Sequence, residues 1–101
     1  MKIVLTYLDD EQKIEEMINA LLQEKLAACI STFPCKSTYW WNNKIESNNE
    51  SVIWIKTKDD LVDEVTKKVK ELHSYDVPVI DVIDAKINSE GQQWLNEVLK
   101  N

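Results

Sequence analysis

The stretch Thr38-Tyr39-Trp40-Trp41-Asn42-Asn43-Lys44-Ile45 decides the fold, because it has the form of a tight turn between two long strands. The dipeptide Asn42-Asn43 tolerates the left-handed backbone that a two-residue hairpin turn needs. Residues 27–41 before it and 44–57 after it are nearly equal in length and rich in β-branched and aromatic residues. The sequence therefore predicts one long β-hairpin over residues 27–57.

This hairpin is too long for a domain of this size. A strand rises about 3.3 Å per residue, so arms of roughly 14 residues reach about 45 Å, whereas a compact domain of about 100 residues measures roughly 30 to 35 Å across. We therefore expect the tip to overhang the core and its aromatic residues, Tyr39, Trp40 and Trp41, to be covered by another copy of the chain. In the alternative interpretation, Pro34 and the polar residues 47–50 divide the hairpin into two shorter ones.

Composition limits the size and the partners of the protein. The chain has 101 residues, of which 44% are hydrophobic, and this is enough for one domain over residues 1–101. Its net charge is -6 and all 12 basic residues are lysine. Nucleic acid is disfavoured as a partner, because phosphate recognition relies on a positive surface and often on arginine.

The N-terminus and the cysteines indicate the compartment. The apolar run in residues 1–8 reaches Asp9 and Asp10 too soon for a signal peptide or a membrane span. Cys29 and Cys35 lie about 20 Å apart if both belong to one straight strand, which is too far for a disulfide. We expect reduced thiols, a cytoplasmic location and no membrane contact.

The remaining segments complete an alternating pattern. Residues 2–8 form a strand, and a helix follows that Asp9 or Asp10 caps, with Gln12 as the partner of Asp9 in a capping box. Residues 52–57 resemble a central strand, and Thr57 is expected to cap the second helix. Residues 79–85 form the last strand, and a capping box of Ser89 with Gln92 begins a short terminal helix.

The order of these elements is strand, helix, strand, strand, helix, strand, short helix. It predicts an α+β fold, the ferredoxin-like split βαβ sandwich, with a long central hairpin and a short C-terminal helix. Both longer helices would cover one face of a four-stranded antiparallel sheet. Covering the other face or the overhanging tip requires further subunits, so we expect an oligomer.

Four motifs resemble, in order and spacing, the signatures of the CutA divalent-cation-tolerance family. They are Leu26-Ala27-Ala28-Cys29, the stretch 39–45, Ile55-Lys56-Thr57 and the stretch 73–78. The resemblance implies a homotrimer similar to the PII signalling proteins, with hairpins exchanged between neighbours, and a link to tolerance of copper and other divalent metals. The chain departs from the family pattern at Cys35, Asn43, Ser74 and Val79.

Two residues are candidate metal ligands. His73, combined with Cys29 or with Asp76, would supply an imidazole with a thiolate or a carboxylate, which suit copper or zinc. Alternatively, His73 is a helix C-terminal cation and Cys29 an inert buried thiol. No CxxC, HExxH or paired-histidine spacing is present. A site of this kind would therefore borrow ligands across a subunit boundary.

Other residues are candidates for a cleft and an interface. Lys56 lies near the end of a strand, and the resemblance places Tyr75, Asp76 and Trp94 with it in an intersubunit cleft. The tip aromatics are expected at the trimer interface, with an aromatic binding wall as the alternative. An enzyme would use His73 as a general base oriented by Asp76.

The sequence thus predicts a homotrimeric, cytoplasmic, non-enzymatic binding or signalling module that weakly binds a divalent cation such as copper(II) and has no other cofactor. One alternative is a PII-like sensor of a small anion in the intersubunit cleft. The other is a small-molecule enzyme that uses His73.

Overall fold

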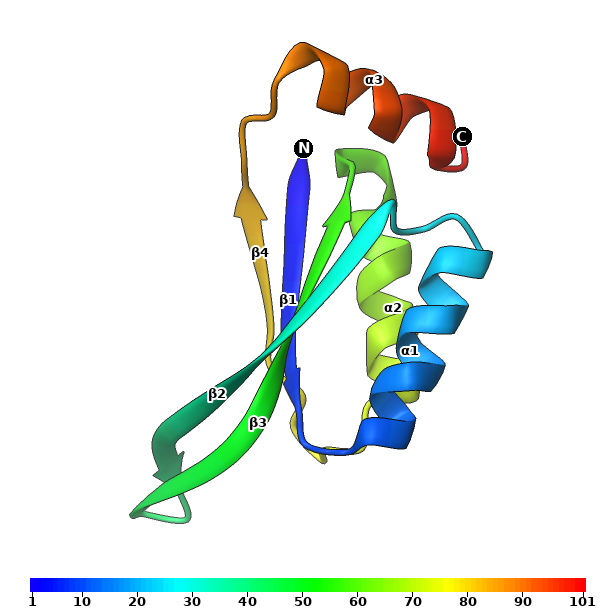
Figure 1. Cartoon of the computed structure of the whole chain (residues 1–101). Coiled ribbons are helices and arrows are strands. Elements are labelled where there is room, and N and C mark those ends of the chain that lie inside the picture. Colours follow the sequence, from blue (N-terminus) through cyan, green and yellow to red (C-terminus); the bar gives the residue numbers. More distant parts are fainter.

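A four-stranded antiparallel sheet forms the centre of the molecule, and two helices cover one of its faces (Figure 1). The computed structural model describes residues 1–101. In chain order the elements are β1 (Lys2–Leu8), α1 (Glu11–Gln23), β2 (Cys29–Trp41), β3 (Lys44–Thr57), the 3-10 turn η1 (Asp59–Leu61), α2 (Val62–Leu72), β4 (Ile80–Asp84) and α3 (Ser89–Val98). The strand order is β2-β3-β1-β4. The predicted ferredoxin-like α+β fold, with its long β2-β3 hairpin and short C-terminal helix, is confirmed.

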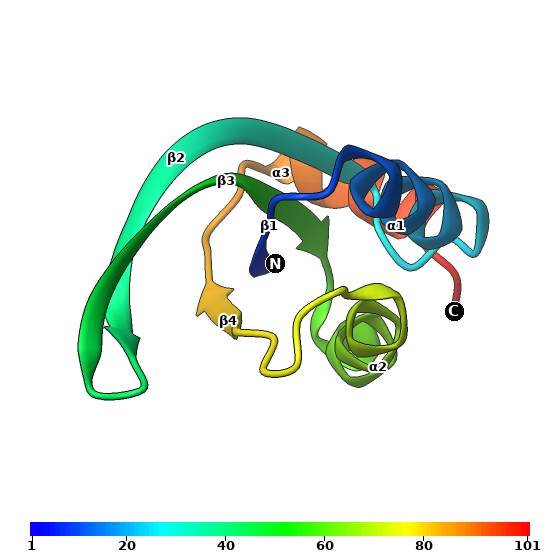
Figure 2. The same ribbon diagram turned by 90° about the horizontal axis from the view of Figure 1, so that it is seen from below.

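The β2-β3 hairpin is continuous and projects beyond the core. Asn42 and Asn43 both have positive φ, at 51° and 61°, as a type I′ hairpin turn requires. The molecule measures 45 Å along its longest axis against 25 Å and 21 Å along the others. Figure 2 shows the hairpin curling away from the rest of the sheet. The predicted overhang is therefore present.

The alternative of two shorter hairpins is wrong. Pro34 pairs with Ser51, and Ser37 pairs with Asn48, so neither Pro34 nor the polar residues 47–50 interrupt the ladder. Strand β2 lies at the edge of the sheet. Because an edge strand has one unpaired side, a proline without an N–H group is tolerated there.

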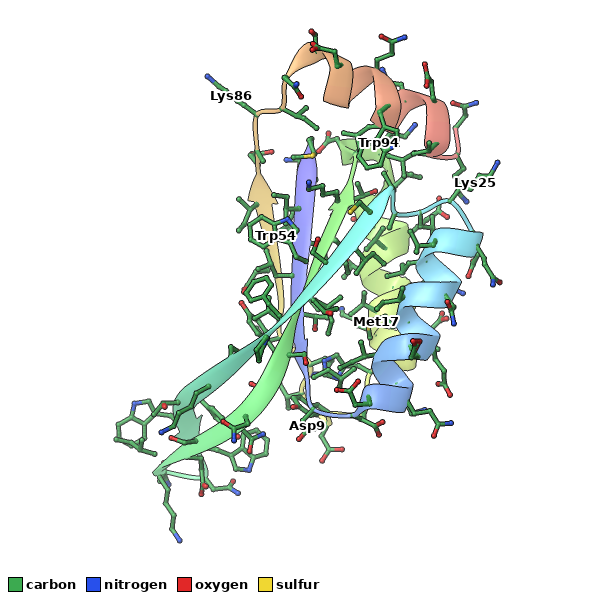
Figure 3. All side chains as sticks on the ribbon, viewed as in Figure 1. Asp9, Met17, Lys25, Trp54, Lys86 and Trp94 are labelled. Atoms are coloured by element: carbon green, nitrogen blue, oxygen red, sulfur yellow. The ribbon has the colours of Figure 1, made fainter.

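The main core lies between the sheet and the helices. Alternate residues of β1, such as Val4 and Leu8, face the helices, while the residues between them face the other side. Met17 lies between α1 and the sheet (Figure 3). The other buried contributors come from both helices, from β3 and from the C-terminal segment: Leu21, Ile53, Ile55, Val65, Val69, Leu95 and Leu99. Apolar stripes at helical and strand spacing account for this layer.

The second face of the sheet carries a smaller apolar cluster. Ile3, Leu5 and Val52 are buried there, with Trp54 beside them. Phe33 packs against Trp54 with ring centroids 6.4 Å apart, yet Phe33 keeps 45% of its surface exposed. No helix covers this face, so apolar side chains remain at the surface of the single chain.

Two predicted capping boxes are displaced by one residue. Asp10, one of the two predicted caps of α1, is the residue that caps it, and its carboxylate, not that of Asp9, accepts hydrogen bonds from the N–H groups of Gln12 and Lys13. Asn88, not Ser89, caps α3 by accepting from the Gly91 N–H at 3.2 Å. In both places two adjacent residues have suitable side chains, and only the one with extended backbone just before the helix can cap it.

The predicted cap of the second helix is wrong. Thr57 remains part of β3, and it is completely buried. Its hydroxyl donates to the Leu26 carbonyl at 2.6 Å and so ties β3 to the segment before β2. Lys58 and η1 separate Thr57 from α2, which has no side-chain cap. The last strand is also shorter than predicted, covering Ile80–Asp84.

The two cysteines agree with the expectation of reduced thiols. Cys29 and Cys35 are both free thiols. None of the helices has the length and apolar character needed to cross a lipid bilayer.

Candidate functional site

A concavity of about 630 Å³ lies between the outer half of the β2-β3 hairpin and the segment that joins α2 to β4. Residue Tyr7 at the end of β1 closes its base. Figure 2 shows how the curl of the hairpin places its tip on the same side of the molecule as β4. The residues that line the concavity are Tyr7, Ser37, Tyr39, Trp40, Trp41, Asn48, Glu50, Ser74, Tyr75, Asp76, Val77 and Val79.

The charged groups of this concavity are all acidic. Glu50 and Asp76 are its only charged side chains, and neither forms an ion pair within the chain. The remaining polar groups are hydroxyls, an amide and indoles. Because a fixed negative charge attracts cations and repels anions, the site favours a positively charged occupant.

Two tyrosine–carboxylate hydrogen bonds hold the walls together. The Tyr75 hydroxyl donates to Glu50 Oε2 at 2.5 Å and joins the α2–β4 segment to the middle of the hairpin. Burial, followed by this hydrogen bond, raises the pKa of Tyr75 far above its usual value. The Tyr7 hydroxyl donates to Asp81 at 2.7 Å, and this bond, followed by burial, raises the pKa of Tyr7 to about 12. Both hydroxyls are therefore neutral donors at pH 7.

His73 lies behind the concavity as the C-terminal cap of α2. Its Nδ1 accepts the Tyr75 N–H at 3.2 Å, and its ring meets the Tyr75 ring edge-on at 4.7 Å between centroids. Burial lowers the pKa of His73, and the Tyr7 backbone, Glu50 and Asp9 only partly oppose this effect. The imidazole is therefore neutral, with its proton on Nε2. It does not act as a cation at the helix terminus.

The tautomer of His73 does not fit a metal ligand in this conformation. Nε2 is buried and has no hydrogen-bond partner of normal geometry, but it carries the proton because Nδ1 accepts a hydrogen bond. Coordination through Nε2 would move the proton to Nδ1 and break the bond from Tyr75. No group of three or more His, Cys, Asp and Glu side chains in the chain is arranged to hold a metal ion.

The comparisons with known proteins agree over the whole chain. The model of the family described as CutA1 divalent ion tolerance protein matches residues 2–98. The chain belongs to this family. The divalent-cation tolerance protein CutA of Pyrococcus horikoshii is 40% identical over 101 residues, which are 99% of each chain. The crystal structure of CutA1 from the same organism has a TM-score of 0.93 at 38% identity, with full coverage of both chains.

A second solved structure of the CutA1 family matches equally well. It is the protein of Archaeoglobus fulgidus described as the periplasmic divalent cation tolerance protein CutA, with a TM-score of 0.93 and 33% identity. The match covers 99% of this chain and 100% of that one. The family resemblance based on four motifs is thereby confirmed.

The residues predicted from the CutA1-like motifs fall into two groups in one chain. Tyr75 and Asp76 line the concavity. Lys56 pairs with Ile3 at the opposite end of the sheet, and Trp94 belongs to α3, at the end of the molecule away from the hairpin tip (Figure 3). The chain therefore brings together only half of the predicted cleft.

The predicted metal pair is also separated. Cys29 pairs with Lys56, which in turn pairs with Ile3 of β1. His73 instead lies beside Tyr7 at the other end of the same strand. Four residues of a strand span about 13 Å, so His73 and Cys29 of one chain cannot share an ion.

The tip aromatics of this CutA1 family member line the concavity and are also exposed on the single chain. Trp40 is 72% exposed, its cross-strand partner Ile45 is 65% exposed and Trp41 is 47% exposed. The two tryptophans alternate along β2, yet both reach the concavity.

Several lining residues are not predicted as site residues from the sequence, among them the two hydrogen-bonded residues Glu50 and Tyr7. By sequence, Glu50 belongs to the polar residues 47–50 and Tyr7 to the first strand. No local pattern indicates the bond between Glu50 and Tyr75, because it depends on how the α2–β4 segment meets the hairpin.

Proposed function

We propose that this chain serves divalent-cation tolerance as a homotrimeric binding or signalling module in the cytoplasm. Copper(II) and other divalent cations would be weakly and reversibly bound ligands, without a resident cofactor and without catalysis. The observation that carries this proposal is the concavity, which has no cationic side chain and two carboxylates that form no ion pair within the chain.

Weak binding follows from the number of available ligands. A hard divalent cation takes six or more oxygen ligands, and copper(II) prefers imidazole and other nitrogen ligands in a tetragonal arrangement. The concavity offers the carboxylates of Glu50 and Asp76 together with hydroxyls. If His73 and Cys29 also bind the ion, they must come from different subunits.

Two separate exposed apolar surfaces support assembly. One is the hairpin tip, where Trp40 and Ile45 are largely exposed, and the other is the helix-free face of the sheet with Phe33 and Ile83, which are 45% and 43% exposed. Large exposed apolar patches on a small protein are usually interaction sites. Two different surfaces on one chain can meet head to tail and close a ring. A ring of three chains is what the four sequence motifs imply.

The two alternatives gain no comparable support. The anion sensor would use an intersubunit cleft with Lys56, which does not line the concavity, and the charged groups of the concavity itself are carboxylates. A general base needs a free lone pair, whereas Nδ1 of His73 already accepts a hydrogen bond and Nε2 carries the proton.

A calorimetric titration of the reductant-free protein with copper(II) tests the metal part of the proposal. We expect a weak, saturable signal that Glu50→Gln and Asp76→Asn reduce and that Glu46→Gln, an exposed acid of β3 outside the lining, leaves unchanged. Loss of the signal in both His73→Ala and Cys29→Ser would place the ion between subunits. A nonsaturating signal that is the same in every variant would contradict direct metal binding.

A further inference from the structure

We propose that Lys56 of one chain forms an ion pair with Asp76 of the partner subunit, and that this pair fixes how the copies join. The inference rests on the proposed function only in taking the protein to be a ring of identical chains. It goes beyond that function by naming two groups that recognise each other across the interface.

Lys56 is a positive charge in an apolar part of the helix-free face of the sheet. It pairs with Cys29 of β2 and with Ile3 of β1. Ile3 also pairs with Ile83 of β4, so one row of side chains crosses all four strands. Directly opposed residues of an antiparallel sheet project to the same face, and Ile3 belongs to the apolar cluster of the helix-free face. Lys56 is half-buried in this row and forms no ion pair within the chain.

Covering the helix-free face requires a negative partner for this ammonium group. Phe33 and Ile83 are 45% and 43% exposed, and such apolar side chains are the surface that assembly buries. Burying a charge without a partner is strongly unfavourable, whereas a carboxylate beside it offsets much of the cost. The surface that covers Lys56 therefore has to bring a carboxylate.

Asp76 is a negative charge in equally apolar surroundings on the other exposed surface. Its neighbours Val77 and Val79 line the concavity with it and are 61% and 54% exposed. The second carboxylate of the concavity, Glu50, already accepts a hydrogen bond from Tyr75. Asp76 is exposed and forms no ion pair within the chain. It is therefore the carboxylate available to a neighbouring copy.

Lys56 and Asp76 cannot meet within one chain. Lys56 is level with Ile3 at one end of β1, whereas the segment that carries Asp76 lies beside Tyr7 at the other end (Figure 1). Four residues of a strand separate these ends by about 13 Å. When the hairpin side of one chain meets the helix-free face of the next, each Lys56 reaches Asp76 of the partner subunit, and every interface of the ring is alike.

The pair selects one arrangement of the copies. Apolar contact is non-directional and depends mainly on buried area, whereas opposite charges in apolar surroundings penalise every arrangement that leaves one of them unpaired. The ammonium group also adds positive charge near Glu50, which agrees with weak rather than tight binding of metal cations.

Charge reversal tests the pair, with assembly measured by sedimentation over a dilution series in the same dilute urea for all variants. Lys56→Glu and Asp76→Lys each place like charges opposite each other, so either variant should raise the concentration needed for half assembly at least about tenfold. The double variant carries the two charges in exchanged positions and should assemble within about threefold of the parent chain. Circular dichroism should show folded chains, because neither side chain belongs to the buried core.

Two further sets of variants control the experiment. Lys70→Glu on α2 and Glu15→Lys on α1 make the same changes in net charge at exposed positions of the helix layer, and they should leave assembly unchanged. Lys56→Gln and Asp76→Asn remove each charge without reversing it and keep the test valid if a reversed chain does not fold. Each leaves its partner buried and unpaired, so the double neutral variant should assemble better than either single one.

The outcomes separate this inference from the proposed function. A double variant that assembles no better than the single variants would overturn the ion pair, and a parent chain with the mass of three chains would still support the trimer. Normal assembly of Lys56→Glu would also overturn the pair. A parent chain that stays a monomer would refute the trimer and the ion pair together.

Discussion

The hydrogen bond between Tyr75 and Glu50 should stabilise the protein by joining the middle of the hairpin to the α2–β4 segment. Tyr75→Phe removes only the hydroxyl, because the ring packs against the main core and phenylalanine retains it. A hydrogen bond to a charged group contributes about 1.5 to 3 kcal/mol. Both side chains here are only half-buried, so water replaces part of the interaction, and we expect a loss of about 1 to 2 kcal/mol.

Urea denaturation followed by circular dichroism measures this loss. The protein concentration must be held constant, since the stability of an oligomer depends on it. Tyr39→Phe is the matched control, because no hydrogen bond of the Tyr39 hydroxyl holds the fold together, and it should change the free energy of unfolding by less than about 0.5 kcal/mol.

A double-mutant cycle with Glu50→Gln isolates the pair. The combined variant should lose less free energy than the two single variants together, with a coupling of about 1 kcal/mol. A coupling below about 0.3 kcal/mol, which is within the usual additivity of independent sites, would refute the role assigned to this bond.

Three further predictions concern pH, the buried threonine and assembly. The hydrogen bond to Asp81 and burial raise the pKa of Tyr7 to about 12, while an unfolded tyrosine ionises near pH 10. The stability that this pair contributes is therefore complete below about pH 10 and is lost as the pH rises towards 12. Tyr7→Phe should flatten this pH dependence of the free energy of unfolding, measured by urea denaturation. Thr57→Val should lower the free energy of unfolding by about 1 to 3 kcal/mol, because the Leu26 carbonyl loses its buried donor; thermal denaturation checks this, and an unchanged midpoint would contradict it. Trp41→Ala should weaken assembly more than Glu46→Ala in sedimentation velocity, since it removes aromatic area rather than an exposed charge; equal effects would remove the tip from the interface.

The architecture could be predicted from the sequence because it follows from local patterns. The apolar run in residues 2–8 and the turn at Asn42-Asn43 predict β1 and the hairpin without reference to distant residues. The caps could be predicted only to within one residue, since Asp9 and Asp10 are equally suitable by type. Backbone conformation at the start of the helix decides between them, since Asp10 is the residue with extended backbone directly before Glu11.

The candidate site was only partly predictable because it depends on long-range geometry. Tyr75 and Asp76 were identified by their motif, but the partner Glu50 lies 25 residues before Tyr75. The pairing of His73 with Cys29 is wrong within one chain because Cys29 lies level with Ile3 and His73 beside Tyr7, at opposite ends of β1. Ligand type alone does not indicate which end of a sheet a side chain occupies.

Sedimentation equilibrium at micromolar protein concentration tests most directly whether the overhanging hairpin assembles the protein. The exposed tip and the helix-free face of the sheet predict a single species with the mass of three chains of 11.8 kDa each. A mass of one chain, unchanged as the concentration rises, would contradict the trimer and leave the tip aromatics without the partner proposed for them.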